Sequence, residues 1–311
     1  MESGLESEEQ TVSGLTTSKE LCSKAQREGY AVGAFNSVNM ESTQAIFRAA
    51  EAERAPFILQ ITQTTLAYTD PEELFAITTA LSERATVPHA IHLDHGRSFA
   101  VVMRFLRLGM TSVMIDGSLQ EDGKTPRSYE ENIEVTRKVV EAAHALGVSV
   151  EGEIGRLGQI EKAEQETLLT DPGEAARFVG DTGVDLLAVA IGTKHGLFKG
   201  TPKIYHERVG EIAKQVGLPL VMHGGTGVPD DAVRAGVKNG ICKINIDTQI
   251  RVAFYEAILE QADRIRKEFA DADAKGDVHK FDIRGILAPA RDAMTEAIRG
   301  RIRVFGASGK A

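Results

Sequence analysis

The segment VMHGGTG (residues 221–227) joins the end of an apolar, strand-like run to a turn that contains three glycines. Outward from it, between residues 30 and 270, short runs rich in valine, isoleucine and leucine alternate with longer charged, amphipathic segments. This alternation is typical of repeated strand–helix units around a parallel sheet. Strands are expected at 32–36, 57–62, 89–94, 111–116, 148–153, 185–191, 218–222 and 241–246. Helices are expected at 41–54, 71–85, 98–108, 128–146, 173–182, 203–215, 229–238 and 248–270.

Eight units of this kind fill the roughly 250 residues of a closed (β/α)8 barrel, and no proline- or glycine-rich linker divides them. The rival fold is an open doubly wound sheet, which often has a GxGxxG turn after its first strand. Here the first expected strand ends in FNSVNM (35–40), whereas HGLFKG (195–200) and HGGTG (223–227) follow strands six and seven. Barrels often bind phosphate with the loops after strands seven and eight. The sequence therefore predicts an α/β chain with a single (β/α)8 TIM-barrel domain over residues 16–311.

Charge and cysteine content limit the class of protein. The chain has 36 Lys and Arg against 45 Asp and Glu, a net charge of −9, which argues against nucleic acid or an anionic membrane as a partner. The longest apolar stretches, such as DLLAVAIG (185–192), are far shorter than the roughly 20 residues of a membrane span. Cys22 and Cys242 form no CxxC pattern, which favours reduced thiols and a cytoplasmic location. Residues 1–15 are acidic and serine-rich, have no targeting signal, and are expected to form a disordered tail.

Three histidines follow expected strands: His95 in HLDHG (92–96), His195 in GTKHGLFKG (192–200), and His223. The carboxyl ends of the strands of a barrel meet at one rim, so these histidines are expected to converge there. Three protein ligands and an open fourth position are the arrangement of a catalytic zinc ion. The sequence thus predicts a catalytic metal site.

Carboxylates join the histidines at the same rim. Asp94 and His95 are adjacent at the end of a strand, so one could face the barrel mouth as a proton carrier while its neighbour turns toward the metal. Asp116 in MIDGS and Glu153 in EGEIG are candidates to bind a second or displaced metal ion or to orient an imidazole, and helix capping is the alternative for Asp116. His89 and His92 are expected to be satisfied structurally, with His92 pointing into the barrel.

After Glu153 the chain enters a long polar stretch, GRLGQIEKAEQETLLTDPGE (155–174). Long ordered loops at a barrel mouth are usually lids that exclude water. The loop contains Glu161, Glu164 and Glu166, each a candidate base, and a solvated charged loop is the alternative.

The chain resembles the class II, zinc-dependent fructose- and tagatose-bisphosphate aldolases from about residue 18 to 300. The resemblance rests on AFN (34–36), HLDHG, MIDGS, VEGEIGRLG (150–158), LTDP (169–172), GVDLLAVAIGT with HGL, TPKI (201–204), HGGTGVP and KINIDT. It implies a zinc-dependent lyase that reversibly cleaves a ketose bisphosphate, first of all fructose 1,6-bisphosphate. The products would be dihydroxyacetone phosphate and an aldehyde such as glyceraldehyde 3-phosphate.

The resemblance also implies residue roles. His95, His195 and His223 would bind Zn2+, and Asp116 and Glu153 would lie near an alternative metal position for a second divalent or monovalent cation. Asp94 would give a proton to the aldehyde oxygen in the condensation direction, and Glu161 would move the proton at C3 of dihydroxyacetone phosphate. Zinc would act as the Lewis acid, so no lysine Schiff base is required.

Substrate contacts follow from the resemblance as well. Arg251 matches the position that reaches the far phosphate, with an exposed helix charge as the alternative. Asp247 favours the fructose over the tagatose configuration, because tagatose-specific members tend to have alanine there. The residues expected around the ketone phosphate and the substrate are Asn36, Thr62, Gly196, Lys199, Gly224, Gly225, Thr226, Asn245, Asp247 and Thr248.

Departures from the family pattern leave the substrate open. The insertion LQEDGKTPRSYE (119–130) contains Lys124 and Arg127, which could recognise an anionic aldehyde, although its composition favours a solvated loop. Lys194 and Gln159 also differ from the residues expected there. An aldolase for tagatose 1,6-bisphosphate, for a sulfofructose phosphate or for an inositol-derived phospho-ketoacid is therefore an alternative.

Two other classes of function fit the sequence less well. A metal-dependent barrel hydrolase usually has an HxH pair on its first strand, which VGAFNSV (32–38) lacks. A non-catalytic binding barrel would have no reason to keep the three histidines with Asp94 and Glu161. The family resemblance further suggests a homodimer or homotetramer.

Overall fold

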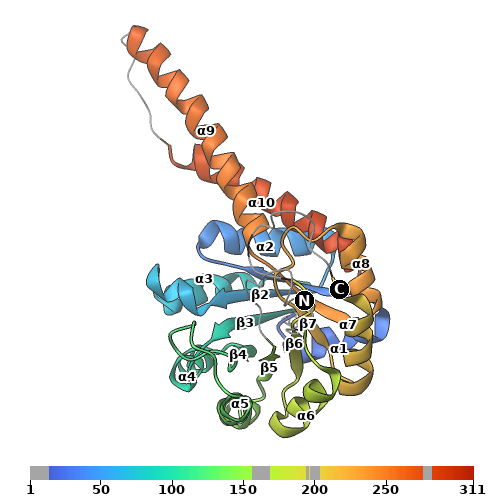
Figure 1. The fold of residues 1–311 in the computed structure, drawn as a ribbon. Coiled ribbons are helices and arrows are strands. Elements are labelled where there is room, and N and C mark those ends of the chain that lie inside the picture. Colours follow the sequence, from blue (N-terminus) through green and yellow to red (C-terminus); the bar gives the residue numbers. More distant parts are fainter. Residues whose placement is uncertain (1–13, 156–168, 194–195, 197–203, 276–281) are drawn as a thin grey trace, which may run out of the picture.

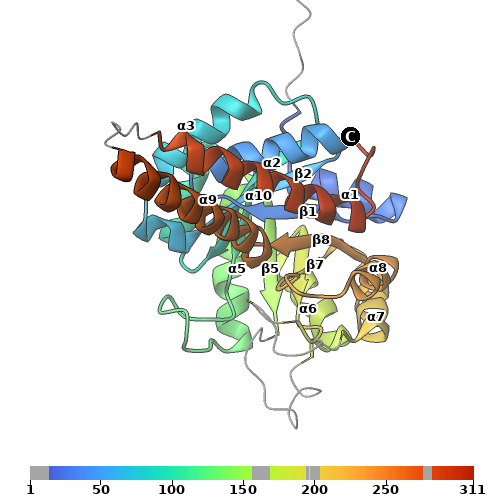
Figure 2. The same ribbon diagram turned by 90° about the horizontal axis from the view of Figure 1, so that it is seen from above.

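Eight parallel strands close into a barrel in the computed structural model, which describes residues 14–155, 169–193, 196, 204–275 and 282–311. The strands follow one another around the barrel in sequence order, and the last pairs with the first (Figures 1 and 2). Their bounds are β1 Val32–Asn36, β2 Phe57–Thr62, β3 His89–Gly96, β4 Ser112–Ile115, β5 Ser149–Ile154, β6 Leu186–Val189, β7 Leu220–Met222 and β8 Ile241–Ile246. Every strand lies on a range expected from the sequence, so the predicted (β/α)8 barrel is confirmed.

One helix follows each strand and packs on the outside of the barrel. Polar residues cap several of these helices. Ser128 forms a capping box with Glu131, and the side chain of Asp171, directly before Pro172, accepts from the Glu174 N–H. Such caps satisfy backbone donors that have no partner within the helix. The bounds are α2 Met40–Glu53, α3 Pro71–Ser82, α4 Phe99–Leu108, α5 Tyr129–His144, α6 Pro172–Thr182, α7 His206–Val216, α8 Asp230–Lys238 and α9 Thr248–Lys275, with a short 3-10 helix η1 at Gln63–Ala67.

A helix outside the repeat, α1 (Ser18–Glu28), closes the amino-terminal end of the barrel. It contacts β1, β3, β5 and β8, and its Leu21, Cys22 and Ala25 are buried. Leu15 forms a parallel bridge with His89, the first residue of β3. The last two residues of the expected tail, 14 and 15, are therefore paired with the barrel, whereas residues 1–13 lie outside the described range.

A further helix, α10 (Arg284–Val304), packs along α2 and α9. The first part of α9 lies against the barrel, and the rest extends well beyond it together with the start of α10 (Figure 1). After α10 the chain returns to the barrel, where the Ala31 N–H donates to Phe305 O and the Gly309 N–H donates to Glu53 O. The segment from 282 onward is thereby tied to the first strand–helix unit. No helix among the described residues has the length and apolar composition to span a membrane.

The inside of the barrel contains fully buried polar side chains. Gln60 on β2, His92 on β3, Glu151 on β5 and Lys243 on β8 each have no solvent-accessible area. Buried charges require partners, because moving an ion out of water costs on the order of several kcal/mol. These four side chains find their partners in one another and in the residues at the carboxyl ends of the strands.

Candidate active site

The end of β3 places two consecutive side chains, Asp94 and His95, at the mouth of the barrel. In a regular strand, neighbours point to opposite faces, but the pairing with β4 shifts register between Leu93 and Gly96 and His95 has φ 52°. A Cβ at Gly96 would lie 2.8 Å from Met114 O, so β4 can approach this closely only because residue 96 is glycine. The break brings both side chains to the same end of the barrel.

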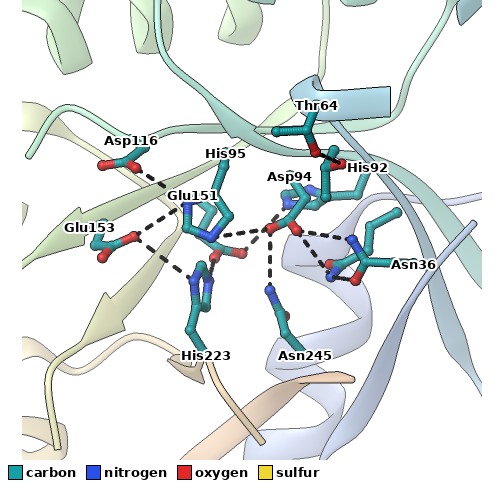
Figure 3. Close-up of polar contacts among 12 residues, drawn as sticks. Asn36, Thr64, His92, Asp94, His95, Asp116, Glu151, Glu153, His223 and Asn245 are labelled. Carbon is teal, nitrogen blue, oxygen red and sulfur yellow. Dashed lines mark hydrogen bonds and ion pairs between the residues drawn. The ribbon is translucent and has the colours of Figure 1, made fainter. Parts of the chain in front are cut away.

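Imidazoles and carboxylates cluster around His95 (Figure 3). Donor atoms of Asp94, His95 and His223 lie within 4.8 Å of one another, and so do those of His95, Asp116 and Glu153. The His95 and His223 rings meet edge to face at 4.8 Å between centroids. Glu153 Oε2 lies 3.9 Å from His95 Nδ1 and 3.8 Å from His223 Nδ1. Imidazole nitrogens with carboxylate oxygens are donors that suit zinc, so the residues present fit the ion that the sequence predicts.

The charged groups of this cluster strongly shift one another's pKa values. Burial lowers the pKa of His95, but the carboxylates of Asp94, Asp116 and Glu153 outweigh that effect and raise it to about 10. Burial, and next the charge of Asp116, raises the pKa of Glu153 well above its ordinary value. Three acidic groups in one buried pocket produce the negative potential that a cation would neutralise.

His223 is held from inside the barrel by Glu151. The His223 Nε2–H donates to Glu151 Oε1 at 2.8 Å, while Nδ1 faces the cluster. Lys243 Nζ lies 2.8 Å from Glu151 Oε2, and His92 Nε2 lies 3.8 Å from the same oxygen. Metal-binding histidines commonly have their second nitrogen fixed in this way.

Sequence reasoning did not single out Glu151 and Lys243. A signal was present, because in a strand every second residue shares a face. Glu151 is two residues before Glu153, and Lys243 is two residues before Asn245. Each therefore points inward one layer below a residue that was recognised.

Asp94 is fixed by amides on neighbouring strands. Asn36 Nδ2 donates to Asp94 Oδ2 at 3.2 Å, and Asn245 Nδ2 donates to Oδ1 at 3.2 Å. Gln60 Nε2 lies 3.4 Å from Oδ2 and donates to Asn36 Oδ1 at 2.6 Å. Burial raises the pKa of Asp94, yet the positive charges of His95, His223 and Lys243 outweigh it and hold the pKa below its ordinary value. Asp94 is thus an oriented carboxylate that remains ionised.

The expected structural histidines have internal partners. His89 Nε2 lies 2.6 Å from Ser82 Oγ and its Nδ1 lies 2.9 Å from Val87 O. His92 Nδ1 is hydrogen-bonded to Ser112 Oγ at 2.8 Å. Asp116 accepts from Ser118 Oγ and faces His95, with Nδ1–Oδ2 3.3 Å, so it takes part in the cluster rather than capping a helix.

A cleft of about 780 Å3 opens above the cluster. Most of the site residues predicted from the sequence line it: Asn36, Thr62, Asp94, His95, Asp116, Glu153, Gly196, Gly224, Thr226, Asn245, Asp247, Thr248 and Arg251. Gly225 instead packs against β8, where a Cβ would lie 2.8 Å from Ile244 Cγ2. His195, Lys199 and Glu161, with Lys194, Gln159, Glu164 and Glu166, lie outside the described residues.

One wall of the cleft is formed by the turns after β7 and β8. Gly224 has φ 65°, and the Gln249 N–H donates to Thr226 Oγ1 at 3.4 Å, which joins the glycine-rich turn to the start of α9. Backbone N–H groups in the first turn of a helix are suited to bind anions. This wall has the features of a phosphate site.

The chain matches known proteins over nearly its whole length. The family model described as fructose-bisphosphate aldolase class-II matches residues 16–310. A fructose-bisphosphate aldolase from Thermus caldophilus is 42% identical, covering 96% of this chain and 100% of the relative. A sulfofructosephosphate aldolase from Alkalicoccus urumqiensis is 37% identical, covering 94% and 97%.

A solved structure agrees with these matches. The YdjI aldolase from Escherichia coli K12 superposes with a TM-score of 0.82 at 31% identity, over 96% of this chain and 99% of that one. The resemblance inferred from the motifs, and with it the aldolase class of enzyme, is confirmed. The chain belongs to the class II fructose-bisphosphate aldolase family.

Proposed function

We propose that this chain reversibly cleaves fructose 1,6-bisphosphate to dihydroxyacetone phosphate and glyceraldehyde 3-phosphate. The observation that carries the proposal is the convergence of Asp94, His95 and His223 within 4.8 Å beneath a cleft whose wall is built from glycine-rich turns. A proton carrier, metal ligands and an anion site are the three parts that the reaction needs.

The metal would be Zn2+, held by His95 and His223 together with His195. Asp116 and Glu153, which face His95, would serve an alternative position or a second cation. When bound, zinc would supply a Lewis acid that stabilises negative charge developing on the ketone half of the substrate. Glu151 orients His223 for this role.

Asp94 would move the proton at the bond that breaks. In cleavage its carboxylate accepts the proton of the C4 hydroxyl, the C3–C4 bond breaks, and the electron pair remains on the C3 half. In condensation the same group returns the proton to the aldehyde oxygen. Amide donors from Asn36 and Asn245 hold this carboxylate in place to accept the proton. Glu161 would exchange the proton at C3 of dihydroxyacetone phosphate.

The ketone phosphate would bind on the wall formed after β7 and β8. Gly224, Thr226 and the start of α9 at Thr248 line this wall, and Gly196, Lys199, Gly225, Asn245 and Asp247 complete the proposed set. Asn36, at the end of β1 beside β8, and Thr62, at the end of β2, would also contact the substrate. Asp247 supports the fructose configuration.

A second candidate substrate is a sulfofructose phosphate, because one relative at 37% identity is named for it. The decisive test compares fructose 1,6-bisphosphate, tagatose 1,6-bisphosphate and sulfofructose 1-phosphate in coupled assays of dihydroxyacetone phosphate release. Zinc-stripped protein should be inactive and should recover with zinc. Release that survives chelation, or a strong preference for the tagatose sugar, would contradict the proposal.

We also propose a homodimer or homotetramer in the cytoplasm. Tyr255 and Leu259 are one turn apart on the projecting α9 and are 61% and 48% exposed, which suits contact with a second copy. Cys22 and Cys242 are free and buried, as expected in a reducing compartment. Light scattering of the Tyr255→Glu variant should show a smaller particle than the wild type; an unchanged mass would contradict this interface.

A further inference from the structure

We propose that Arg97 and Lys124 form a second anion site, which binds the terminal oxyanion of the aldehyde half of the substrate. The oxyanion would be a phosphate or a sulfonate, since both present tetrahedral anionic oxygens. This inference rests on the proposed aldolase function and identifies residues that choose among its substrates.

Arg97 lines the cleft with a guanidinium that has one unpaired, buried nitrogen among the described residues. Its backbone N–H donates to Gln63 Oε1 at 2.8 Å, which fixes the residue directly after β3. The unpaired nitrogen of the guanidinium is Nε, for which the described part of the chain supplies no hydrogen-bond acceptor. Among the described residues no carboxylate forms an ion pair with it. A buried donor without a partner is costly, and a guanidinium fork matches oxyanions in geometry and charge.

The inserted segment between β4 and α5 places Lys124 in the lining of the same cleft as Arg97. Asp122 Oδ1 accepts from the Lys124 and Thr125 N–H groups at 2.8 and 2.9 Å, and Oδ2 accepts from Thr125 Oγ1 at 2.6 Å. Leu119 and Pro126 form an antiparallel bridge at its base. The loop is thus ordered by its own hydrogen bonds, while most of its residues are exposed to solvent.

This loop lies directly against Arg97. A Cβ at Gly123 would be 2.5 Å from Arg97 Cζ, so the loop backbone passes close to the guanidinium, and the φ of 66° at this residue favours glycine. Arg127 holds the loop in place, donating to Leu119 O and, at 3.5 Å, to Arg97 O. Lys124 lines the cleft and forms no ion pair among the described residues. Two cations that form no ion pair among the described residues therefore line the same side of the cleft.

The third basic side chain that lines the cleft within the described residues is already paired. Arg251 Nη2 lies 2.6 Å from Asp247 Oδ2. An anion approaching Arg251 would have to compete with that carboxylate, whereas Arg97 and Lys124 form no ion pair among the described residues.

The topology places the two cation groups on opposite sides of the reacting centre. Arg97 and Lys124 follow β3 and β4, whereas the phosphate wall and Arg251 follow β7 and β8. In an eight-stranded closed barrel these pairs of strands face each other across the axis. A substrate with its ketone phosphate on the β7–β8 wall and its reacting carbons over Asp94 would extend its other end toward Arg97.

The test uses substrates with and without the terminal anion. The zinc-loaded wild type and the Arg97→Gln, Lys124→Gln and Arg251→Gln variants are assayed on fructose 1,6-bisphosphate, sulfofructose 1-phosphate and fructose 1-phosphate. Arg107→Gln, the same change at an exposed residue of α4 outside the cleft, is the control. Arg97→Lys keeps the positive charge and therefore tests whether charge alone supports binding. Melting temperatures of all variants show whether a variant has lost its fold.

Arg97→Gln should lower kcat/KM on the substrates with a terminal anion about 10- to 100-fold, mainly through KM, the range expected for a charge-assisted hydrogen bond. Lys124→Gln should act in the same direction with a smaller effect because it is exposed. Fructose 1-phosphate should be cleaved equally by all these variants. If Arg97→Gln lowers kcat/KM more on one anionic substrate than on the other, the terminal oxyanion of that substrate is the preferred one.

Three results would overturn the inference: equal losses on fructose 1-phosphate, a loss confined to Arg251→Gln, or a wild type that does not prefer substrates with the terminal anion. In each of these the proposed aldolase function stands. A wild type that cleaves none of the three ketose phosphates would instead reject the proposed function, and this inference with it.

Discussion

Lys243 Nζ lies 2.8 Å from Glu151 Oε2, and neither side chain is accessible to solvent. The pair sits inside the barrel directly below the histidine–carboxylate cluster. Because Glu151 also accepts from His223, this carboxylate links a structural cation to a candidate metal ligand.

Removing the cation should destabilise the barrel. In Lys243→Met the charge of Glu151 is left buried and uncompensated, so the free energy of unfolding should fall by about 3–5 kcal/mol. Urea denaturation measures the change. The double variant Lys243→Met/Glu151→Gln should recover part of the loss. Lys138→Met, which breaks an exposed pair with Glu134, should change stability little; a comparable loss there would refute the explanation.

Neutralising the carboxylate should loosen the metal site. Glu151→Gln weakens the contact that orients His223, so zinc affinity should fall about 10- to 100-fold, the usual effect of losing a partner of a metal-bound histidine. Competition with a chromogenic chelator measures the affinity directly, independently of turnover. Glu134→Gln, a change on the exposed face of α5, is the matched control. Unchanged zinc affinity in Glu151→Gln would show that His223 is oriented by other contacts.

Replacing the proposed proton carrier should affect turnover rather than metal content. Asp94→Asn keeps the size of the side chain but cannot accept the C4 hydroxyl proton, so kcat should fall about 10²- to 10⁴-fold. Zinc content, measured on the purified variant, should match that of the wild type. A rise in KM with kcat unchanged, or loss of zinc, would point to a role in binding.

Acid should weaken the junction between α2 and α10 through Glu53. Hydrogen bonds from Arg303, and also from Ser308 and Arg299, lower the pKa of Glu53 from 4.5 to about 2. A carboxylate with a depressed pKa stabilises the fold above its unfolded pKa, and this contribution disappears as the pH falls through the folded pKa.

The Glu53→Gln variant tests this contribution. It should unfold more easily than the wild type at pH 7, by about 1–2 kcal/mol once solvent screening is allowed for. The difference should shrink between pH 4.5 and about 2. Thermal melts of both proteins across this range provide the measurement, and a difference that is independent of pH would exclude the ionised carboxylate as its source.

The repeat of apolar runs and amphipathic segments was sufficient to predict the barrel, because each strand–helix unit has its own local signal. The two helices outside the repeat, α1 and α10, were not predicted, because neither belongs to a strand–helix unit. The end of α9 was placed at 270 rather than Lys275, since this helix leaves the barrel and loses the pattern that burial imposes.

Candidate site residues could be predicted where the residue type itself indicates the chemistry, as with the histidine and the aspartate at positions 95 and 94. It was not predictable where the role depends on a break in the strand or on charge balance. The left-handed backbone of His95 leaves no mark in the sequence apart from Gly96. Arg97 was not singled out, because an arginine beside a strand end is ordinary until its lack of a carboxylate partner is seen.

The pairing of β8 with β1 has a consequence for how the chain reaches this state. Until β8 is available, β1 presents an open edge to other chains, since half of its backbone groups lack their neighbour. Contacts such as that between Ala31 and Phe305 postpone closure further, because they join segments from the two ends of the sequence. Slow, late closure is therefore expected, and partly folded chains should be most prone to aggregate just before it.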